Sequence, residues 1–338
     1  MKVTKIVVTG GPCGGKSTGL QWIDKAFSEM GYKVLFIPET ATELISGGVA
    51  PWTAASNAEF QKCVMSLQLK KEEVFTLAAK GMDADKVLIV CDRGAVDNKA
   101  YMTDEEYAEV LEYTGRSPIT LRDSYDAVFH LVTAAKGAEK FYTTDNNSAR
   151  TETIPQAAAL DDKLISVWTG HPHLRILDNS TDFKGKMERL TAEIASFLGE
   201  PEPCETERKF LIEYPDINEL EKNPLCDSVE ITQTYILEEG ADECRVRKRG
   251  KNGEYIYSKT SKTKVSDIRR KEIEDRISEE EYNSLLSKAD PERKELRKTR
   301  YCLVSGSQYF EIDIYPFRND IAIMEIELAS ENDEVIFP

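Results

Sequence analysis

A nine-residue segment near the N-terminus constrains the fold of this chain more than any other feature. Gly10–Thr18 reads GGPCGGKST, which fits the pattern G-x-x-x-x-G-K-[ST]. The apolar run Lys5–Val8 before it predicts a buried strand, and Ser17–Met30 after it has helical spacing. A strand, a glycine loop and a helix N-terminus form an anion site, because backbone N–H groups and the helix dipole both favour a bound anion. The segment therefore predicts a phosphate-binding loop that opens an α/β domain.

The chemistry of this loop predicts how each part of it would contact a nucleotide. Lys16 would reach the β- and γ-phosphates, and the Ser17 hydroxyl would hold Mg²⁺. A chance glycine turn is the alternative, and the strand and helix on either side make it the weaker one. The predicted nucleotide-binding residues are Gly10, Gly11, Pro12, Cys13, Gly14, Gly15, Lys16, Ser17 and Thr18.

Strand-like and helix-like segments alternate over the first 200 residues. The predicted strands are Lys5–Val8, Lys33–Ile37, Lys86–Cys91, Ala127–Val132 and Leu174–Leu177. The predicted helices between and after them are Phe60–Lys80, Asp104–Tyr113, Ile154–Trp168 and Asp182–Leu198. This alternation predicts a parallel sheet with helices on both faces, and ligands bind at the carboxyl ends of such strands.

Two acidic residues follow predicted strands at that edge of the sheet. Asp92 comes after an apolar strand, and an acid at this position beside a phosphate loop usually orients Mg²⁺ or its water. Glu39 follows Lys33–Ile37 by two residues and is a candidate for substrate binding or for a base toward a hydroxyl. Either acid would instead cap the next helix in the alternative interpretation.

The segment Lys136–Glu152 is polar and weakly periodic. In a kinase-like fold such a segment forms a lid, and Arg150 would then reach the transferring phosphate as a catalytic residue. A plain surface loop is an equal alternative from the sequence alone.

Four motifs of this first region together resemble one family of nucleotide-binding domains. They are Gly10–Thr18, Pro38–Leu44, Cys91–Gly94 and Trp168–His173. The set resembles the NadR and TRPL-translocation-defect type of P-loop domain, which is related to small-molecule kinases. The resemblance implies binding of ATP or GTP and a role as a kinase of a small metabolite. Asn98–Tyr101 breaks the guanine motif N-K-x-D at its last position, so GTP has no support from that motif.

Charge and composition divide the chain and limit its partners. The net charge of −16 argues against DNA or another long nucleic acid as a partner. Residues 201–338 carry 22 basic and 32 acidic side chains, a far denser set than that of residues 1–200, and the change falls at Gly199–Pro203. We therefore expect domains at 1–200 and 201–338. Seven cysteines without metal-ligand spacing, no apolar stretch of 18 residues and no signal peptide predict a cytoplasmic protein without a transmembrane segment.

Charged residues of the same sign recur at a spacing of two along the second domain. The pairs are Glu205 with Glu207, Arg245 with Arg247, Glu272 with Glu274, Lys298 with Arg300, Glu311 with Asp313, and Glu325 with Glu327. Alternate strand positions share one face, so each strand would have a charged face and an apolar face. A solvated sheet face is the alternative. A closed barrel with inward charges accounts better for the same-sign pairs, because basic pairs would bind a polyanion and acidic pairs would hold Mg²⁺ or Mn²⁺.

The order of these motifs resembles a second family. Glu205-x-Glu207-x-Lys209 opens the region, and Tyr257-x-x-Thr260-x-Lys262 stands among the pairs given above. This order is similar to that of the CYTH, or triphosphate tunnel metalloenzyme, family. The resemblance implies an eight-stranded antiparallel tunnel in an α+β domain that binds a triphosphate with a divalent metal. Members hydrolyse inorganic triphosphate, thiamine triphosphate or RNA 5′-triphosphates, or cyclise ATP.

The resemblance also implies roles for individual residues. The implied metal ligands are Glu205, Glu207, Asp313, Glu325 and Glu327. The implied phosphate-binding residues are Lys209, Arg245, Arg247, Lys262, Lys298 and Arg300. Lys209 would also orient the attacking water, which makes it a candidate catalytic residue. Attack of water on phosphorus would then be assisted by the metals and the basic wall.

Functions of different classes stay open at this stage. The first is an enzyme that cleaves inorganic triphosphate or a nucleoside triphosphate, with a P-loop domain that binds or turns over nucleotide. The second is a regulatory protein without significant catalysis, because the two-domain order resembles TRPL-translocation-defect proteins, which are linked to GTP and phosphoinositide binding in membrane trafficking. Phosphoinositide headgroups would then bind the basic clusters of the second domain. An RNA 5′-triphosphatase is a third hypothesis, and the acidic composition argues against it.

Overall fold

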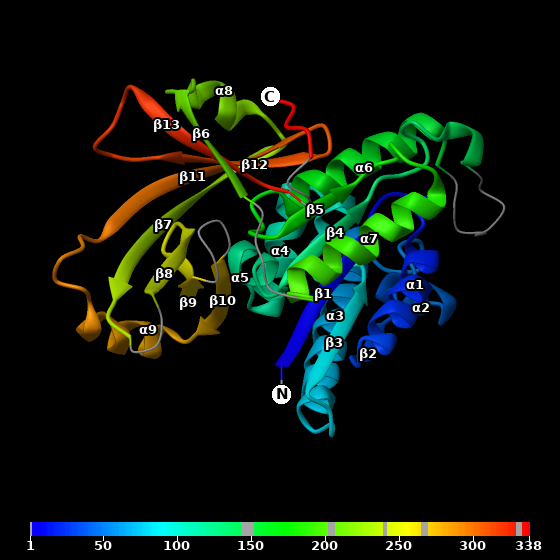
Figure 1. Cartoon of the computed structure of the whole chain (residues 1–338). Helices are drawn as coiled ribbons and strands as arrows, with labels where there is room; N and C mark the ends of the chain where they lie inside the picture. Colours follow the sequence, from blue (N-terminus) through cyan, green and yellow to red (C-terminus); the bar gives the residue numbers. More distant parts are fainter. Residues whose placement is uncertain (1, 143–151, 202–206, 239–241, 265–269, 329–332) are drawn as a thin grey trace. The chain divides into compact units, whose positions relative to one another are not determined.

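The computed structural model describes residues 2–142, 152–201, 207–238, 242–264, 270–328 and 333–338. The chain divides into two compact units, Met1–Thr191 and Ala192–Pro338, each with its own sheet. Figure 1 shows both sheets and labels their strands.

The sheet of the first unit is parallel throughout and has the strand order β2-β3-β1-β4-β5. Its strands are β1 (Lys2–Thr9), β2 (Lys33–Ile37), β3 (Lys86–Asp92), β4 (Ala127–Leu131) and β5 (Leu174–Leu177). Its helices are α1 (Lys16–Glu29), α2 (Thr40–Ser46), α3 (Asn57–Lys80), η1 (Ala95–Tyr101), α4 (Asp104–Thr114), α5 (Pro118–Arg122), η2 (Glu139–Phe141), α6 (Ile154–Trp168) and α7 (Phe183–Leu198), the last of which extends past the boundary between the units. The predicted strands and helices are confirmed, with ends that differ by a few residues, and helices cover both faces of the sheet (Figure 1).

The central strand positions the phosphate loop. Ile6, Val7 and Val8 of β1 are fully buried, as expected for a strand between two neighbours with helices on both faces. β3 pairs with one side of β1 and β4 with the other. The chain runs from β1 to β2 and β3 on one side of β1, and then to β4 and β5 on its other side. α/β proteins bind ligands at the carboxyl ends of the strands where the strand order reverses in this way.

The second unit is built on an eight-stranded antiparallel sheet, in the order β10-β9-β8-β7-β11-β12-β13-β6. Its strands are β6 (Glu207–Glu213), β7 (Cys226–Ile236), β8 (Glu243–Lys251), β9 (Glu254–Lys264), β10 (Arg270–Ile277), β11 (Leu296–Ser305), β12 (Gln308–Ile314) and β13 (Ile321–Glu327). The helices are α8 (Ile217–Lys222), α9 (Glu279–Leu285) and η3 (Leu286–Lys288). The number and direction of the strands are those predicted for the tunnel fold. Between the parts of the chain that the structure describes, no ladder joins β10 to β6.

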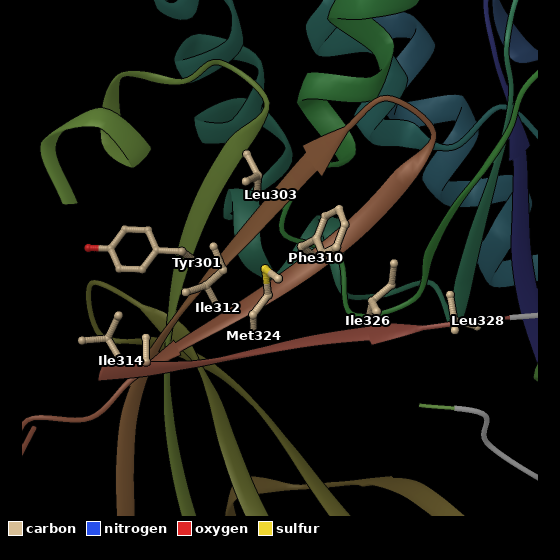
Figure 2. Close-up of a cluster of buried hydrophobic side chains, with 9 residues drawn as sticks. Tyr301, Leu303, Phe310, Ile312, Ile314, Met324, Ile326 and Leu328 are labelled. Atoms are coloured by element: carbon tan, nitrogen blue, oxygen red, sulfur yellow. The ribbon is translucent and has the colours of Figure 1, made fainter. Parts of the chain in front are cut away.

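One face of this sheet carries the apolar core. Figure 2 shows side chains from β11, β12 and β13 packed together on that face. The cluster contains Tyr301, Leu303, Phe310, Ile312, Ile314, Ala322, Met324, Ile326 and Leu328. These positions alternate along each strand, so the residues between them project to the opposite face. That opposite face is where the charged pairs lie.

Candidate functional site

The phosphate loop lies between β1 and α1 at the carboxyl edge of the parallel sheet. Glycine is required at its first position, because Gly10 has φ 141° and a Cβ there would stand 2.1 Å from the carbonyl oxygen of Leu131. Cys13 adopts a left-handed conformation with φ 57° and turns the chain toward the helix. Helix α1 then begins at Lys16. The N–H groups of its first turn have no acceptor within the helix, so they are available to an anion bound at the loop.

The ammonium of Lys16 folds over the loop. Its Nζ donates hydrogen bonds to the carbonyl oxygens of Gly10, at 2.9 Å, and of the next residue, at 3.3 Å. Burial and the charge of Arg93 lower the pKa of Lys16 to about 8, while the charges of Asp92 and Glu39 act in the opposite direction. The structure thus brings together the lysine and the two acids that the sequence predicted from separate segments.

Asp92 is the last residue of β3, one residue beyond the predicted strand end at Cys91, and it does not cap the next helix. Gly94 is the N-cap residue of η1, and the Asp97 carboxylate accepts its backbone N–H at 2.7 Å. Burial raises the pKa of Asp92. The charge of Lys16 acts to lower this pKa, and the charge of Glu39 acts to raise it further. Within the described residues, its buried Oδ1 has no hydrogen-bond partner. A carboxylate oxygen without protein donors matches the ligand chemistry of Mg²⁺, so Asp92 fits the predicted metal role.

Glu39 forms an ion pair that sequence reasoning missed. Arg93 Nε donates to Glu39 Oε1 at 2.7 Å, and Thr42 Oγ1 donates to Oε2 at 2.9 Å. Burial raises the pKa of Glu39, but the charges of Arg93 and Lys16 outweigh burial and leave the pKa below its ordinary value. Glu39 stands at the N-cap position of α2 without a side-chain capping bond, so the capping alternative does not hold. The available signal for Arg93 was its position directly after Asp92.

A second buried carboxylate supports this edge of the sheet. Asp97 Oδ1 accepts hydrogen bonds from Thr9 Oγ1 at 2.6 Å and from Trp168 Nε1 at 2.9 Å. It therefore ties the end of β1 to η1 and to the end of α6. No motif in the sequence indicated this role, because the three partners are far apart along the chain.

Arg150, the remaining candidate catalytic residue of this domain, lies outside the described residues. Of the predicted lid, the structure describes 136–142 and Glu152, and Tyr142 Oη donates to the carbonyl oxygen of Glu152 at 2.8 Å. The lid and the role of Arg150 stay predictions.

In the second unit, strand register places the predicted charged residues on one face. Lys209 of β6 stands opposite Glu325 of β13, and Glu325 stands opposite Glu311 of β12. Asp313 of β12 stands opposite Arg300 of β11. Residues opposite each other in an antiparallel ladder project to the same side of the sheet. The charged face therefore extends across four neighbouring strands of the sheet, in the order β6, β13, β12 and β11.

Arg300 is the centre of this charged face. Its Nε and Nη2 donate to the two carboxylate oxygens of Asp313, each at 2.7 Å, and Nη2 also donates to Glu325 Oε2 at 2.7 Å. Arg300 Nη1 donates to Glu311, and Lys298 Nζ donates to Asp313. Burial raises the pKa of Asp313, but the charges of Arg300 and Lys298 outweigh burial and lower it. Burial and the charge of Arg300 lower the pKa of Lys298 to about 8.

Lys209 connects two of the predicted metal ligands. Its Nζ lies 2.7 Å from Glu325 Oε1 and 3.0 Å from Glu207 Oε1. Burial and the charge of Glu325 raise the pKa of Glu207, as expected for neighbouring carboxylates. Burial also acts to raise the pKa of Glu325, but Arg300, Lys298 and the hydrogen bond from Lys209 together outweigh it and the pKa is lowered. This pair of carboxylates has the oxygen-donor chemistry that Mg²⁺ or Mn²⁺ requires.

The charged face continues beyond β7 with the arginine pair of β8. Arg245 stands opposite Thr260 of β9, and Thr260 stands opposite Glu274 of β10. Arg247 Nη1 lies 3.8 Å from Glu274 Oε2, to which Thr260 Oγ1 donates at 2.9 Å. Burial and the charge of Arg245 lower the pKa of Arg247. Lys262 lies two residues along β9 from Thr260 and therefore on the same face.

The predicted metal ligands are only partly described. Glu205 lies outside the described residues, and Glu327 is exposed at the end of β13. Across the described ranges, no three His, Cys, Asp or Glu side chains are grouped as a metal site. Glu311, which contacts Arg300, was missing from the predicted site residues, although the sequence placed it in a pair with Asp313. The metal roles stay predictions.

No helix in the described part of the chain is long and apolar enough to cross a bilayer.

No curated protein matches the chain. Family models match both domains. Residues 5–186, more than half of the chain, match the model described as an AAA domain, and residues 204–336 match the model described as a CYTH domain. The chain therefore belongs to the AAA-domain family of P-loop proteins, and a CYTH domain follows its P-loop domain.

Proposed function

We propose that the CYTH domain hydrolyses a triphosphate with the help of a divalent cation, while the phosphate loop of the first domain binds a nucleoside triphosphate. Inorganic triphosphate and nucleoside triphosphates are the proposed substrates of the CYTH domain. The observation that carries the proposal is the charged face formed by β6, β13, β12 and β11 on one side of β7 and by β8, β9 and β10 on its other side, in which buried cations stand beside carboxylates.

The chemistry of a triphosphate explains why both signs of charge are needed. A polyanion needs several cations around it, and the face offers Arg245, Arg247, Lys262, Lys298 and Arg300. Charged hydrogen bonds are strong in a site from which water is excluded, and Lys298 and Arg300 are both largely buried. The carboxylates Glu205, Glu207, Asp313, Glu325 and Glu327 are the proposed metal ligands. A bound Mg²⁺ or Mn²⁺ would neutralise phosphate charge and make phosphorus more electrophilic.

Lys209 is the proposed catalytic residue of this domain. Its ammonium stands between Glu207 and Glu325, where it can donate a hydrogen bond to a water or to a phosphate oxygen. Its side chain is 56% exposed, so it remains accessible to a substrate that enters the charged face.

In the first domain, we propose that Gly10–Thr18 bind the phosphates of ATP or GTP, with Ser17 and Asp92 as the Mg²⁺ partners. Glu39 is ionised beside Arg93 and Lys16, which is the state that a base toward an acceptor hydroxyl requires. The finer proposal is that the domain phosphorylates a small molecule, with Arg150 at the transferring phosphate.

Phosphate release from a substrate panel tests the proposal. The panel contains inorganic triphosphate, ATP, GTP and thiamine triphosphate, each with Mg²⁺ or Mn²⁺. Wild type is compared with Lys16→Ala and with the double variant Glu205→Gln, Glu207→Gln. We expect the double variant to lose triphosphate cleavage and Lys16→Ala to retain it. Activity that survives the double variant and disappears in Lys16→Ala would place the hydrolysis in the first domain instead.

Phosphoinositide binding is the alternative function. Two basic residues outside the charged face already pair with acids: Arg293 Nη1 lies 3.2 Å from Glu243, and Arg297 Nε lies 2.7 Å from Glu295. Those pairs leave less free positive charge for a lipid headgroup. Sedimentation with liposomes that contain phosphoinositides tests this alternative, and lipid-dependent pelleting of the Glu205→Gln, Glu207→Gln variant would favour it.

A further inference from the structure

A buried aspartate from a distant helix contacts the phosphate loop. Asp161 lies in the middle of α6 and is 0% exposed. Its Oδ1 accepts the backbone N–H of Gly11 at 2.9 Å and that of Thr133 at 3.2 Å, and it lies 2.9 Å from His130 Nε2. Its Oδ2 accepts a hydrogen bond from Lys136 Nζ at 3.0 Å. Four donors thus converge on one carboxylate beneath the loop.

The loop is shaped to receive this carboxylate. A Cβ at Gly11 would stand 2.8 Å from Asp161 Oδ1, so only glycine allows the contact without a shift. The neighbouring residues are held from the same side, because Thr133 Oγ1 donates to the carbonyl oxygen of Pro12 and the N–H of Ala134 donates to that of Cys13 at 3.3 Å. The entry half of the loop is therefore fixed by contacts with α6 and with the segment after β4.

The charge of the aspartate is also balanced locally. Burial acts to raise the pKa of Asp161, but His130, Lys136 and the N–H of Gly11 outweigh burial and hold the pKa well below its usual range. Asp161 is therefore ionised and accepts all four hydrogen bonds. Its ion pair with Lys136 reduces the repulsion that a carboxylate so close to the loop would exert on bound phosphate.

We propose that Asp161 is a positioning residue for the phosphate loop: it fixes the peptide at Gly11 so that the following N–H groups are already oriented for phosphate. Preordering of this kind lowers the entropy cost of binding. The proposal deepens the nucleotide-binding role proposed above and rests on it. Asp161 does not contact the ligand in this scheme. It acts through the backbone of the loop.

The test combines a near-isosteric variant with a matched control. In Asp161→Asn one carboxylate oxygen becomes an NH₂ group, which opposes either the N–H of Gly11 or the ammonium of Lys136. Glu72→Gln is the control, because Glu72 is also buried, at 3% exposure, and accepts hydrogen bonds from three side chains without contacting the loop. Both variants remove a charge from a satisfied buried site of the same domain.

Two readouts separate the proposal from the nucleotide-binding function on which it rests. Amide hydrogen exchange without nucleotide should accelerate at Gly11 and Thr133 in Asp161→Asn and stay unchanged there in Glu72→Gln. Calorimetric titration with ATP, GTP and pyrophosphate should show affinity about tenfold or more weaker in Asp161→Asn alone, the change that corresponds to about 1.4 kcal/mol. The added change Lys136→Gln supplies an acceptor for the new NH₂ group of Asp161→Asn and should recover part of the affinity.

The outcomes are distinguishable. Unchanged exchange at Gly11, or an equal increase in both variants, overturns the positioning role whatever the nucleotide result. Wild-type protein that binds no probe, combined with faster exchange in Asp161→Asn alone, overturns nucleotide binding and keeps Asp161 as the residue that orders the loop. Equal affinity of wild type and Asp161→Asn overturns the proposal that the order assists binding.

Discussion

Replacement of Arg300 by methionine is the most informative perturbation of the second domain. Arg300 binds three carboxylates at once, those of Asp313, Glu311 and Glu325. Methionine has a comparable length and no charge, so the packing volume is largely kept while the cation is removed. Lys298 would be left as the buried partner of Asp313.

The structure sets the size of the effect. Removal of one partner from a buried ion pair destabilises a protein by about 3–5 kcal/mol. Asp313 is fully buried, but the side chains of Glu325 and Glu311 are 11% and 19% exposed and can regain some hydration. We therefore expect the lower end of the range, a loss of about 3 kcal/mol in the free energy of unfolding of this domain. At a urea slope of about 2 kcal/mol/M, the midpoint would fall by about 1.5 M.

The distribution of tryptophan makes the assay specific for each domain. The three tryptophans are Trp22, Trp52 and Trp168, and all lie in the first unit. Tryptophan fluorescence during urea unfolding therefore follows the first unit, while far-UV circular dichroism follows both. We expect Arg300→Met to shift the dichroism transition and to leave the fluorescence transition in place.

Arg297→Met is the matched control, because Arg297 lies on the same strand, is 73% exposed and has a single ion pair among the described residues. It should change stability by less than about 0.5 kcal/mol.

The pH dependence of the stability of Arg300→Met provides a second test. Without Arg300 the crowded carboxylates have raised folded-state pKa values, so the variant gains stability relative to wild type as pH falls toward about 5. A deficit in Arg300→Met no larger than that in Arg297→Met, or one that grows as pH falls, would refute the electrostatic reasoning.

Three further predictions concern the first domain. Because the pKa of Lys16 is lowered to about 8, nucleotide affinity measured by calorimetry should weaken as pH rises through 8, and the loss should be absent from the residual binding of Lys16→Ala. Gly10→Ala forces a Cβ to within 2.1 Å of the Leu131 carbonyl oxygen, so tryptophan fluorescence should report a destabilisation of at least about 1–3 kcal/mol, and unchanged unfolding would contradict the steric argument. Asp92→Asn should weaken the Mg²⁺ dependence of nucleotide binding while binding in EDTA stays close to wild type, and equal losses with and without Mg²⁺ would exclude the metal role.

The elements of both domains were predictable because their signals are local. The period of two in the charged pairs and the glycine loop between a strand and a helix depend on neighbouring residues only. The identity of contacts was less predictable, because it depends on register. Glu311 stands opposite Glu325 and reaches Arg300, yet its sequence context is the same as that of Asp313. The sequence indicated the pair but not which member would be central.

Asp161 illustrates a different limit. It is a polar residue inside a helix, and most such residues lie on a solvated face. Its burial depends on the loop that packs against it, 150 residues earlier in the chain. Arg93 and Asp97 are similar cases, since their partners come from other strand ends. Long-range packing, which leaves no periodic trace in the sequence, decides all three.

The ion pairs of the charged face have a consequence for how the binding of one ligand affects the binding of another. In this structure the cations and the carboxylates satisfy one another, with Lys209 on Glu325 and Arg300 on Asp313. A triphosphate that engages the cations frees the carboxylates for a divalent ion, and an ion that engages the carboxylates frees the cations for phosphate. Each ligand therefore removes a competitor of the other, and linkage requires that the benefit be equal in both directions. We expect metal and triphosphate to bind cooperatively, because each ligand takes the place of one member of the same ion pairs.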